Sequence, residues 1–267
     1  MDKENHHEIE SKLLVLAKHP KNFLLQIAQK SAVSGYKLIK IGRHEIRDIY
    51  FDSPDGQLKR QRLALRLRKV NDHFLLTVKG KTQFSKWGGV SRLEIELPYS
   101  LSALKEMEDV LRHHQVSLNL FVPKKMTDNP TTFLQNSSLK IIQDRETSRL
   151  IRQVISKERP EEILAEMALD TISYHLENLS VYQAEIELEA KSTKGIEAIR
   201  HIQDYLLKKH PYSLRIWTLS KLTTGLAIEM LFREGKLHSY FGDQNYLLPA
   251  VYDLILKNMN PISQWNE

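Results

Sequence analysis

The chain has 267 residues, enough for one large or two small domains, and its 41% hydrophobic and 27% charged residues exclude an intrinsically disordered protein. It has no cysteine, so we expect no disulfides and no thiolate metal sites. Its N-terminus is polar and no apolar run could span a bilayer, so we expect a cytoplasmic protein without a signal peptide or membrane span. The net charge of +6 and the pI near 9.2 favour anionic partners, but the basic residues lie in alternating pairs, which suits a compact anion better than nucleic acid.

Period-two alternation of apolar and polar residues dominates the first half of the chain and predicts strands. The turn-forming sequence SPDG at 53–56 ends one of them. Asn71 and Asp72 alone separate two others, which predicts a tight hairpin. The predicted strands span residues 8–15, 45–52, 63–70, 73–81 and 91–99.

The second half weakly repeats this order of strands followed by a helix. Residues 122–138 show neither period and contain two prolines, so we interpret them as a long connection between the halves. Strands are predicted at 143–154, 166–176 and 181–191. Apolar residues at spacings of three and four predict helices at 20–33, 101–114, 195–209, 220–232 and 246–259.

Most of the predicted strands carry charges on one face and aliphatic residues on the other, because successive side chains alternate across a strand. In the first strand, Glu8, Glu10 and Lys12 lie opposite Ile9 and Leu13. The same arrangement recurs for Arg66 and Arg68, for Thr77 and Lys79, for Arg92, Glu94 and Glu96, for Glu166 and Asp170, and for Glu185, Glu187 and Glu189.

Two architectures accommodate these faces. An open sandwich would expose the charged faces to water, as antiparallel sheets commonly do. However, like charges about 7 Å apart repel, and glutamate and lysine are unfavourable in strands, so their repetition favours a shared ligand. A closed barrel of about eight strands would turn the charges inward. We therefore predict an α+β fold, with a closed eight-stranded antiparallel β-barrel, a charged interior and helices packed outside.

The charges of such an interior predict its ligands. Carboxylate oxygens bind hard divalent cations. Arginine forks and lysine ammonium groups bind phosphate oxygens. We expect both ligands in one interior, because the opposite charges neutralise each other fully only when both are bound.

Seven motifs, from residue 8 to about 225, resemble those of the CYTH, or triphosphate tunnel metalloenzyme, superfamily. Glu8-x-Glu10-x-Lys12 is similar to the family signature, and the layout is most similar to bacterial inorganic triphosphatases. The chain departs from the family pattern at 222–225, where LTTG replaces Glu-Arg-Gly, so that Arg149 or Arg152 would supply the missing cation. The other motifs are YFDSPDGQLKRQRLALRLRK (50–69), LLTVKGK (75–81), RLEIEL (92–97), EMALD (166–170), AEIELE (184–189) and SK (220–221).

The resemblance implies a tunnel of eight antiparallel strands, dependence on Mg²⁺ or Mn²⁺ and a small triphosphate-containing substrate. It also implies residue roles. The implied catalytic residues are Glu8, Glu10, Glu94 and Glu187. The implied metal ligands are Glu8, Glu10, Glu94, Glu96, Glu185 and Glu187. The implied substrate-binding cations are Lys12, Arg66, Arg68, Lys79, Arg92, Arg145 and Lys221.

The implied reaction is metal-dependent hydrolysis of a phosphoanhydride bond in tripolyphosphate or a nucleoside triphosphate, with one ion on the phosphates and a second activating water. A class IV adenylyl cyclase or a thiamine triphosphatase would use the same interior. A module that binds polyphosphate or an RNA 5′-triphosphate without cleavage is the non-enzymatic alternative. We expect a tunnel domain at 1–235 and a C-terminal helical extension at 236–267, packed on that domain or on a second copy in a homodimer.

Overall fold

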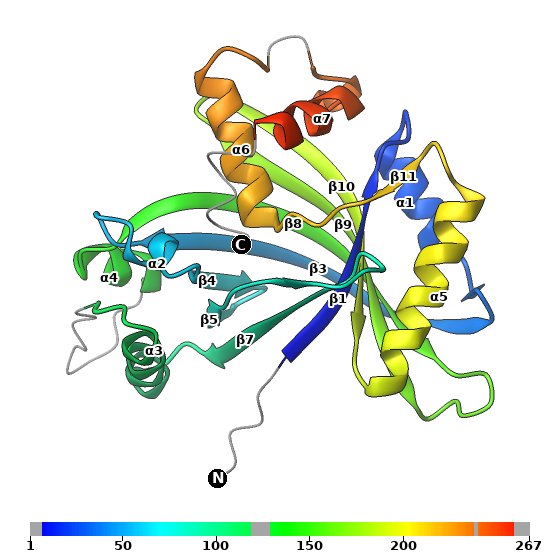
Figure 1. The fold of residues 1–267 in the computed structure, drawn as a ribbon, viewed down its shortest axis with the longest axis horizontal. Helices are drawn as coiled ribbons and strands as arrows, with labels where there is room; N and C mark the ends of the chain where they lie inside the picture. Colours follow the sequence, from blue (N-terminus) through cyan, green and yellow to red (C-terminus); the bar gives the residue numbers. More distant parts are fainter. Residues whose placement is uncertain (1–6, 119–128, 238–239, 259–267) are drawn as a thin grey trace.

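The computed structural model of the protein describes residues 7–118, 129–237 and 240–258. Its strands form one sheet, drawn in Figure 1. The strands are β1 (His7–Val15), β2 (Ala32–Val33), β3 (Tyr36–Asp52), β4 (Ala64–Val70), β5 (His73–Lys79), β6 (Gln83–Phe84), β7 (Val90–Pro98), β8 (Lys140–Ile155), β9 (Ile163–Leu176), β10 (Leu179–Ala190) and β11 (Leu214–Ile216).

Eight antiparallel strands of this sheet close into a ring. The order is β1, β10, β9, β8, β3, β4, β5 and β7, and β7 pairs with β1 again. The strands are not spaced evenly round an axis, because β1 meets β7 only over residues 7–10 whereas β3 pairs with β8 along nearly its whole length. The closed eight-stranded architecture predicted from the alternating faces is therefore confirmed.

Helices lie outside the ring, as predicted (Figure 1). Three of them begin with a proline in the first turn, where the missing N–H has no cost. No helix in the described part of the chain is long and apolar enough to cross a membrane. The helices are α1 (Pro20–Ala28), α2 (Gln57–Arg60), α3 (Leu101–His113), α4 (Pro130–Asn136), α5 (Thr193–Lys209), α6 (Lys221–Arg233) and α7 (Pro249–Lys257), with a 3₁₀ turn at Asp243–Asn245.

Two hydrophobic clusters cover the outer faces of the strands. On one side, α1 and α5 pack on β1, β9 and β10 through residues such as Ile199, Ile186 and Leu169. On the other side, α3 packs on β4 and β5 through residues such as Met107 and Leu67. These outward aliphatic residues alternate with the charged ones, so burying them under helices commits the charged faces to the interior.

A third cluster closes one end of the interior. Leu14 and Tyr174 share a strand face with Lys12 and Asp170, yet they are buried against apolar residues of α6 and α7. The inward face of these strands is therefore charged at Lys12 and Asp170 and apolar at Leu14 and Tyr174. The apolar stretch seats α6, whose first residues consequently reach the charged part.

Several element boundaries differ from the sequence-based predictions. β3 begins at Tyr36 rather than at residue 45, because a bulge between Lys40 and Gly42 interrupts the alternation. The helix predicted to residue 33 ends at Ala28. Part of the predicted connection, 122–128, lies outside the described residues, and the rest contains α4, capped by the Asn129 side chain.

Candidate active site

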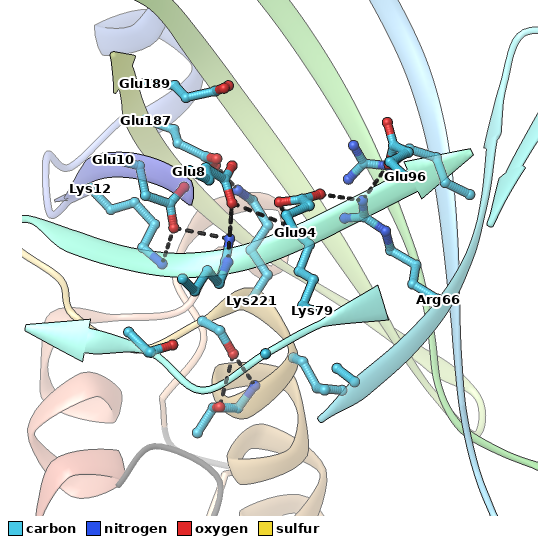
Figure 2. A pocket seen from close by; sticks show the side chains of 18 of the residues that line it. Glu8, Glu10, Lys12, Arg66, Lys79, Glu94, Glu96, Glu187, Glu189 and Lys221 are labelled. Atoms are coloured by element: carbon cyan, nitrogen blue, oxygen red, sulfur yellow. Dashed lines mark hydrogen bonds and ion pairs between the residues drawn. The ribbon is translucent and has the colours of Figure 1, made fainter. Parts of the chain in front are cut away.

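A cavity of about 540 Å³ lies inside the ring. Ten basic and seven acidic side chains line it, so its formal charge is +3. Figure 2 shows the carboxylates of Glu8, Glu10 and Glu187 gathered at one side of this cavity and Arg66 and Glu96 at the other. The cavity therefore presents different charges at its two sides.

Three carboxylates from β1 and β10 converge at the first side. One oxygen each of Glu8, Glu10 and Glu187 lies within 4.8 Å of the others. The register explains this, because Lys12 is paired with Glu187, and the inward side chains of the two strands are neighbours. Arg92 on β7 donates to Glu8 Oε2 from Nε and Nη2, at 3.1 and 2.9 Å.

Glu10 is the least compensated member of this triad. Lys12 Nζ and Arg92 Nη2 lie 3.3 and 3.1 Å from Glu10 Oε1, but neither oxygen of this buried carboxylate accepts a hydrogen bond in the described part of the chain. Burial raises the pKa of Glu10 to about 7, even though Lys12 and Arg92 act in the opposite direction. Two unsatisfied oxygens beside two further carboxylates are a donor set that fits a hard divalent cation.

The second side of the cavity is organised around Asp48 of β3. Arg68 donates to its two oxygens from Nε and Nη2, at 2.7 and 3.0 Å. Arg145 donates to Asp48 Oδ2 at 2.9 Å, and Arg66 Nε lies 3.8 Å from Oδ1. Burial by itself would raise the pKa of Asp48, but the three guanidinium groups outweigh it and hold that pKa well below its usual value.

Paired charges from β4, β5 and β7 connect the two sides of the cavity. Arg66 Nη2 donates to Glu96 Oε2 at 2.8 Å and to Glu94 Oε1 at 3.2 Å. Lys79 donates to Glu94 Oε2 at 2.6 Å and lies 3.6 Å from Glu8 Oε2. Glu94 thus connects the carboxylate triad with the arginine group.

A second carboxylate triad shares Glu187 with the first. Its members, Asp170, Glu185 and Glu187, again offer oxygens within 4.8 Å of one another. Arg149 donates to both Asp170 oxygens, at 2.9 and 2.7 Å, and Lys221 contacts all three carboxylates. Burial would raise the pKa of Glu187, but Lys221 and Arg149 hold it well below its usual value.

The backbone of α6 fixes Lys221 in this triad. Tyr174 donates its hydroxyl to the Lys221 carbonyl at 3.2 Å, and Gln143 Nε2 donates to the Leu222 carbonyl at 2.9 Å. Gly225 allows this close approach, because a Cβ there would lie 2.3 Å from Gln143 Nε2 and 2.5 Å from Tyr174. The sequence TTG at 223–225 thus brings the helix against the strands.

The structure brings together almost all of the residues predicted for the site. The seven predicted cations and five of the six predicted carboxylates line the cavity, and Glu185 lies behind it, fully buried. Their catalytic, metal-binding and substrate-binding roles stay predictions. Of the two suggested substitute cations, Arg149 lines the cavity. Arg152 instead points outward and donates to the Ala28 carbonyl, so the suggestion of Arg152 was wrong.

Sequence reasoning missed two inward residues of β3. Asp48 holds the three arginines, and Tyr50 accepts a hydrogen bond from Arg145 at 3.0 Å. Burial would raise the pKa of Tyr50, but Arg145 and Arg66 lower it to about 8. The alternation of Asp48 and Tyr50 with Ile49 and Phe51 was the available signal.

A closed β tunnel with carboxylates and guanidinium groups facing one interior defines the class of this protein. The family model for the CYTH domain matches residues 6–215, and the chain belongs to this family. A comparison with curated proteins finds no match.

Several solved structures are similar to this chain, and the first of those described below has the same fold. A Hippeastrum protein described as a putative adenylyl cyclase with dominant triphosphatase activity is 19% identical over 86% of this chain and 97% of its own, with a TM-score of 0.53. A putative adenylate cyclase from Bacillus halodurans is 27% identical over 80% and 95%, with a TM-score of 0.49. An RNA triphosphatase of S. pombe is 13% identical over 78% and 84%, with a TM-score of 0.39.

Proposed function

We propose that this protein is a divalent-metal-dependent hydrolase of triphosphate phosphoanhydride bonds, acting on tripolyphosphate, nucleoside triphosphates or both. The observation that carries the proposal is a carboxylate triad, in which Glu10 lacks a hydrogen bond among the described residues, together with an excess of basic over acidic side chains in one cavity of about 540 Å³. This volume lies within the range of small-molecule sites. The motif resemblance to triphosphate tunnel enzymes supports the same reaction.

The metal-binding part of the proposal rests on Glu8, Glu10 and Glu187. Mg²⁺ or Mn²⁺ held there would supply charge neutralisation at phosphate oxygens and a more acidic bound water. Glu10 must be ionised to act as a ligand, so its raised pKa makes this site sensitive to pH near neutrality.

The phosphate-binding part rests on the cations on the other side. Arg68 and Arg145 make their ion pairs with Asp48 alone among the described residues, so a polyanion would gain two guanidinium groups that share one carboxylate. Lys79 would orient the chain of phosphates between this group and the carboxylate triad, because it contacts both Glu94 and Glu8. Guanidinium groups there would also stabilise the charge of the leaving group, which is pyrophosphate from tripolyphosphate and a nucleoside diphosphate from a nucleoside triphosphate.

Product analysis on the purified full chain tests this function. Incubation with tripolyphosphate, ATP and thiamine triphosphate, each with Mg²⁺ or Mn²⁺, should release phosphate from at least one of them, and a chelator should abolish the release. Glu8→Gln should remain folded and lose most of this activity. As a matched control, Glu146→Gln alters an exposed carboxylate and should leave the rate unchanged.

The same assay separates the alternatives. Cyclic AMP formed from ATP in place of free phosphate would identify a cyclase and contradict the proposal. Tight binding of tripolyphosphate without release at any divalent cation would identify a binding module instead. Unchanged turnover in Glu8→Gln would reject the assigned carboxylates.

A further inference from the structure

The two carboxylate triads that share Glu187 differ in what already occupies them. In the triad of Glu8, Glu10 and Glu187, both Glu10 oxygens lack a hydrogen-bond donor within the described ranges. In the triad of Asp170, Glu185 and Glu187, a single ammonium group, that of Lys221, contacts all three carboxylates. Protein cations also contact the members of the first triad, but among the described residues none of them contacts all three.

Lys221 fills the second triad. Its Nζ lies 3.2 Å from Asp170 Oδ2 and 2.5 Å from Glu185 Oε1, and it also contacts Glu187 Oε2. The second oxygens of Asp170 and Glu185 have donors as well, because Gln183 donates to Glu185 Oε2 at 2.8 Å and Arg149 donates to both Asp170 oxygens. An ammonium group surrounded by three carboxylates lies where a divalent cation would otherwise be held.

The position of this ammonium group is built into the fold. Lys221 is the first residue of α6, and the Ser220 hydroxyl caps the helix by accepting from the Thr223 N–H. The Lys221 and Leu222 carbonyls are held by side chains of the ring strands, and Gly225 permits the contact. Moving the ammonium out of the triad would leave three buried carboxylates with Arg149 as their remaining cation.

We propose that Lys221 acts as a built-in cation that replaces a second metal ion, so that this chain binds one divalent cation, at Glu8, Glu10 and Glu187. The inference rests on the proposed function and deepens it. It revises the two-ion arrangement expected from sequence. Lys221 is then a counterion of the glutamates, in addition to its predicted contact with phosphate.

Counting bound ions on the metal-free full chain tests the inference without any measurement of activity. Mn²⁺ is titrated into the protein, and free Mn²⁺ is followed by electron paramagnetic resonance. The wild type should bind one Mn²⁺ per chain. Lys221→Met keeps the aliphatic stem, removes the ammonium and should bind two. Lys194→Met removes an exposed lysine, 62% accessible, and should still bind one, which controls for net charge.

A second variant keeps the inference falsifiable if Lys221→Met fails to fold. Glu185→Gln removes a carboxylate from the filled triad alone, so one Mn²⁺ should still bind, with affinity within about threefold of the wild type. Two ions in the wild type, one in folded Lys221→Met, or lost binding in Glu185→Gln would overturn the inference. No ion in the wild type would instead reject the metal site of the proposed function.

Discussion

The two sides of the cavity solve the same electrostatic problem with opposite signs. Around Asp48, three guanidinium groups share one buried carboxylate. Around Glu187, two carboxylate triads share one residue, and Glu10 keeps two oxygens without a hydrogen bond in the described structure. One side gathers guanidinium groups round a single carboxylate, and the other gathers carboxylates round Glu187.

This difference explains why the charges are retained in the interior. Burying a charge is costly unless it is paired, and the protein pairs most but not all of them. A ligand that brings a polyanion and a divalent cation together completes both sides at once. The following predictions test whether the two sides depend on different ligands.

The largest effect is expected for Asp48→Asn. It leaves the buried Arg145 and the partly buried Arg68 without an ion pair among the described residues, which should lower the free energy of unfolding by about 3–5 kcal/mol in urea titrations. Tripolyphosphate should restore part of this loss. As a control, Asp144→Asn breaks an exposed ion pair with Arg47, which also joins β8 to β3. This change should lower the free energy of unfolding by less than about 1 kcal/mol. Equal losses in the two variants would contradict the buried arginine group.

Glu187→Gln should have the next largest effect, on activity. It alters both triads. A bound metal ion contributes several kcal/mol to the stabilisation of charge in the transition state, and about 1.4 kcal/mol corresponds to a tenfold change in rate. We therefore expect the rate of phosphate release with Mn²⁺ to fall by at least about 100-fold. Circular dichroism should show an unchanged fold. Retained activity would separate Glu187 from the reaction.

The raised pKa of Glu10 should make the free energy of unfolding of the metal-free protein depend on pH. The pKa of Glu10 is about 7 in the folded protein and ordinarily 4.5. Between these pH values only the folded protein keeps the proton, so the free energy of unfolding falls as the pH rises, and the loss is complete above about pH 7. Relative to Glu10→Gln, the wild type should lose up to about 3 kcal/mol between pH 5 and 8. A difference that stays constant over this range in urea titrations with chelator would contradict the assignment.

Two arginines of β8 provide the smallest and most specific comparison. Arg145 faces the cavity and Arg152 faces α1. Arg145→Gln should weaken tripolyphosphate binding by about 10- to 100-fold in calorimetry, as expected for loss of a hydrogen bond to a charged group. Arg152→Gln should leave binding within about twofold. Similar losses in both would place the anion elsewhere.

The strands and their inward faces were predictable because alternation is a local property of the sequence. The hairpin at Asn71 and Asp72 is observed, with Val70 paired with His73. The outward position of Arg152 was also predictable, since it lies three residues from Arg149 along one strand and so on the opposite face.

The partners of the charges were not predictable, because they depend on the order of strands in the ring. Asp48 meets Arg68 and Arg145 only because β3 lies between β4 and β8, with these residues in register. No local pattern specifies that order. The contact of Lys221 with Glu185 depends likewise on the packing of α6 on β8 and β9, through residues distant in sequence.

A crystal structure with Mn²⁺ and a non-hydrolysable triphosphate tests the central claim most directly. Anomalous scattering should place Mn²⁺ within coordination distance of Glu8, Glu10 and Glu187, and the phosphates should contact Arg68 and Arg145 inside the ring. Manganese absent from these carboxylates, or phosphates bound outside the ring, would contradict the account.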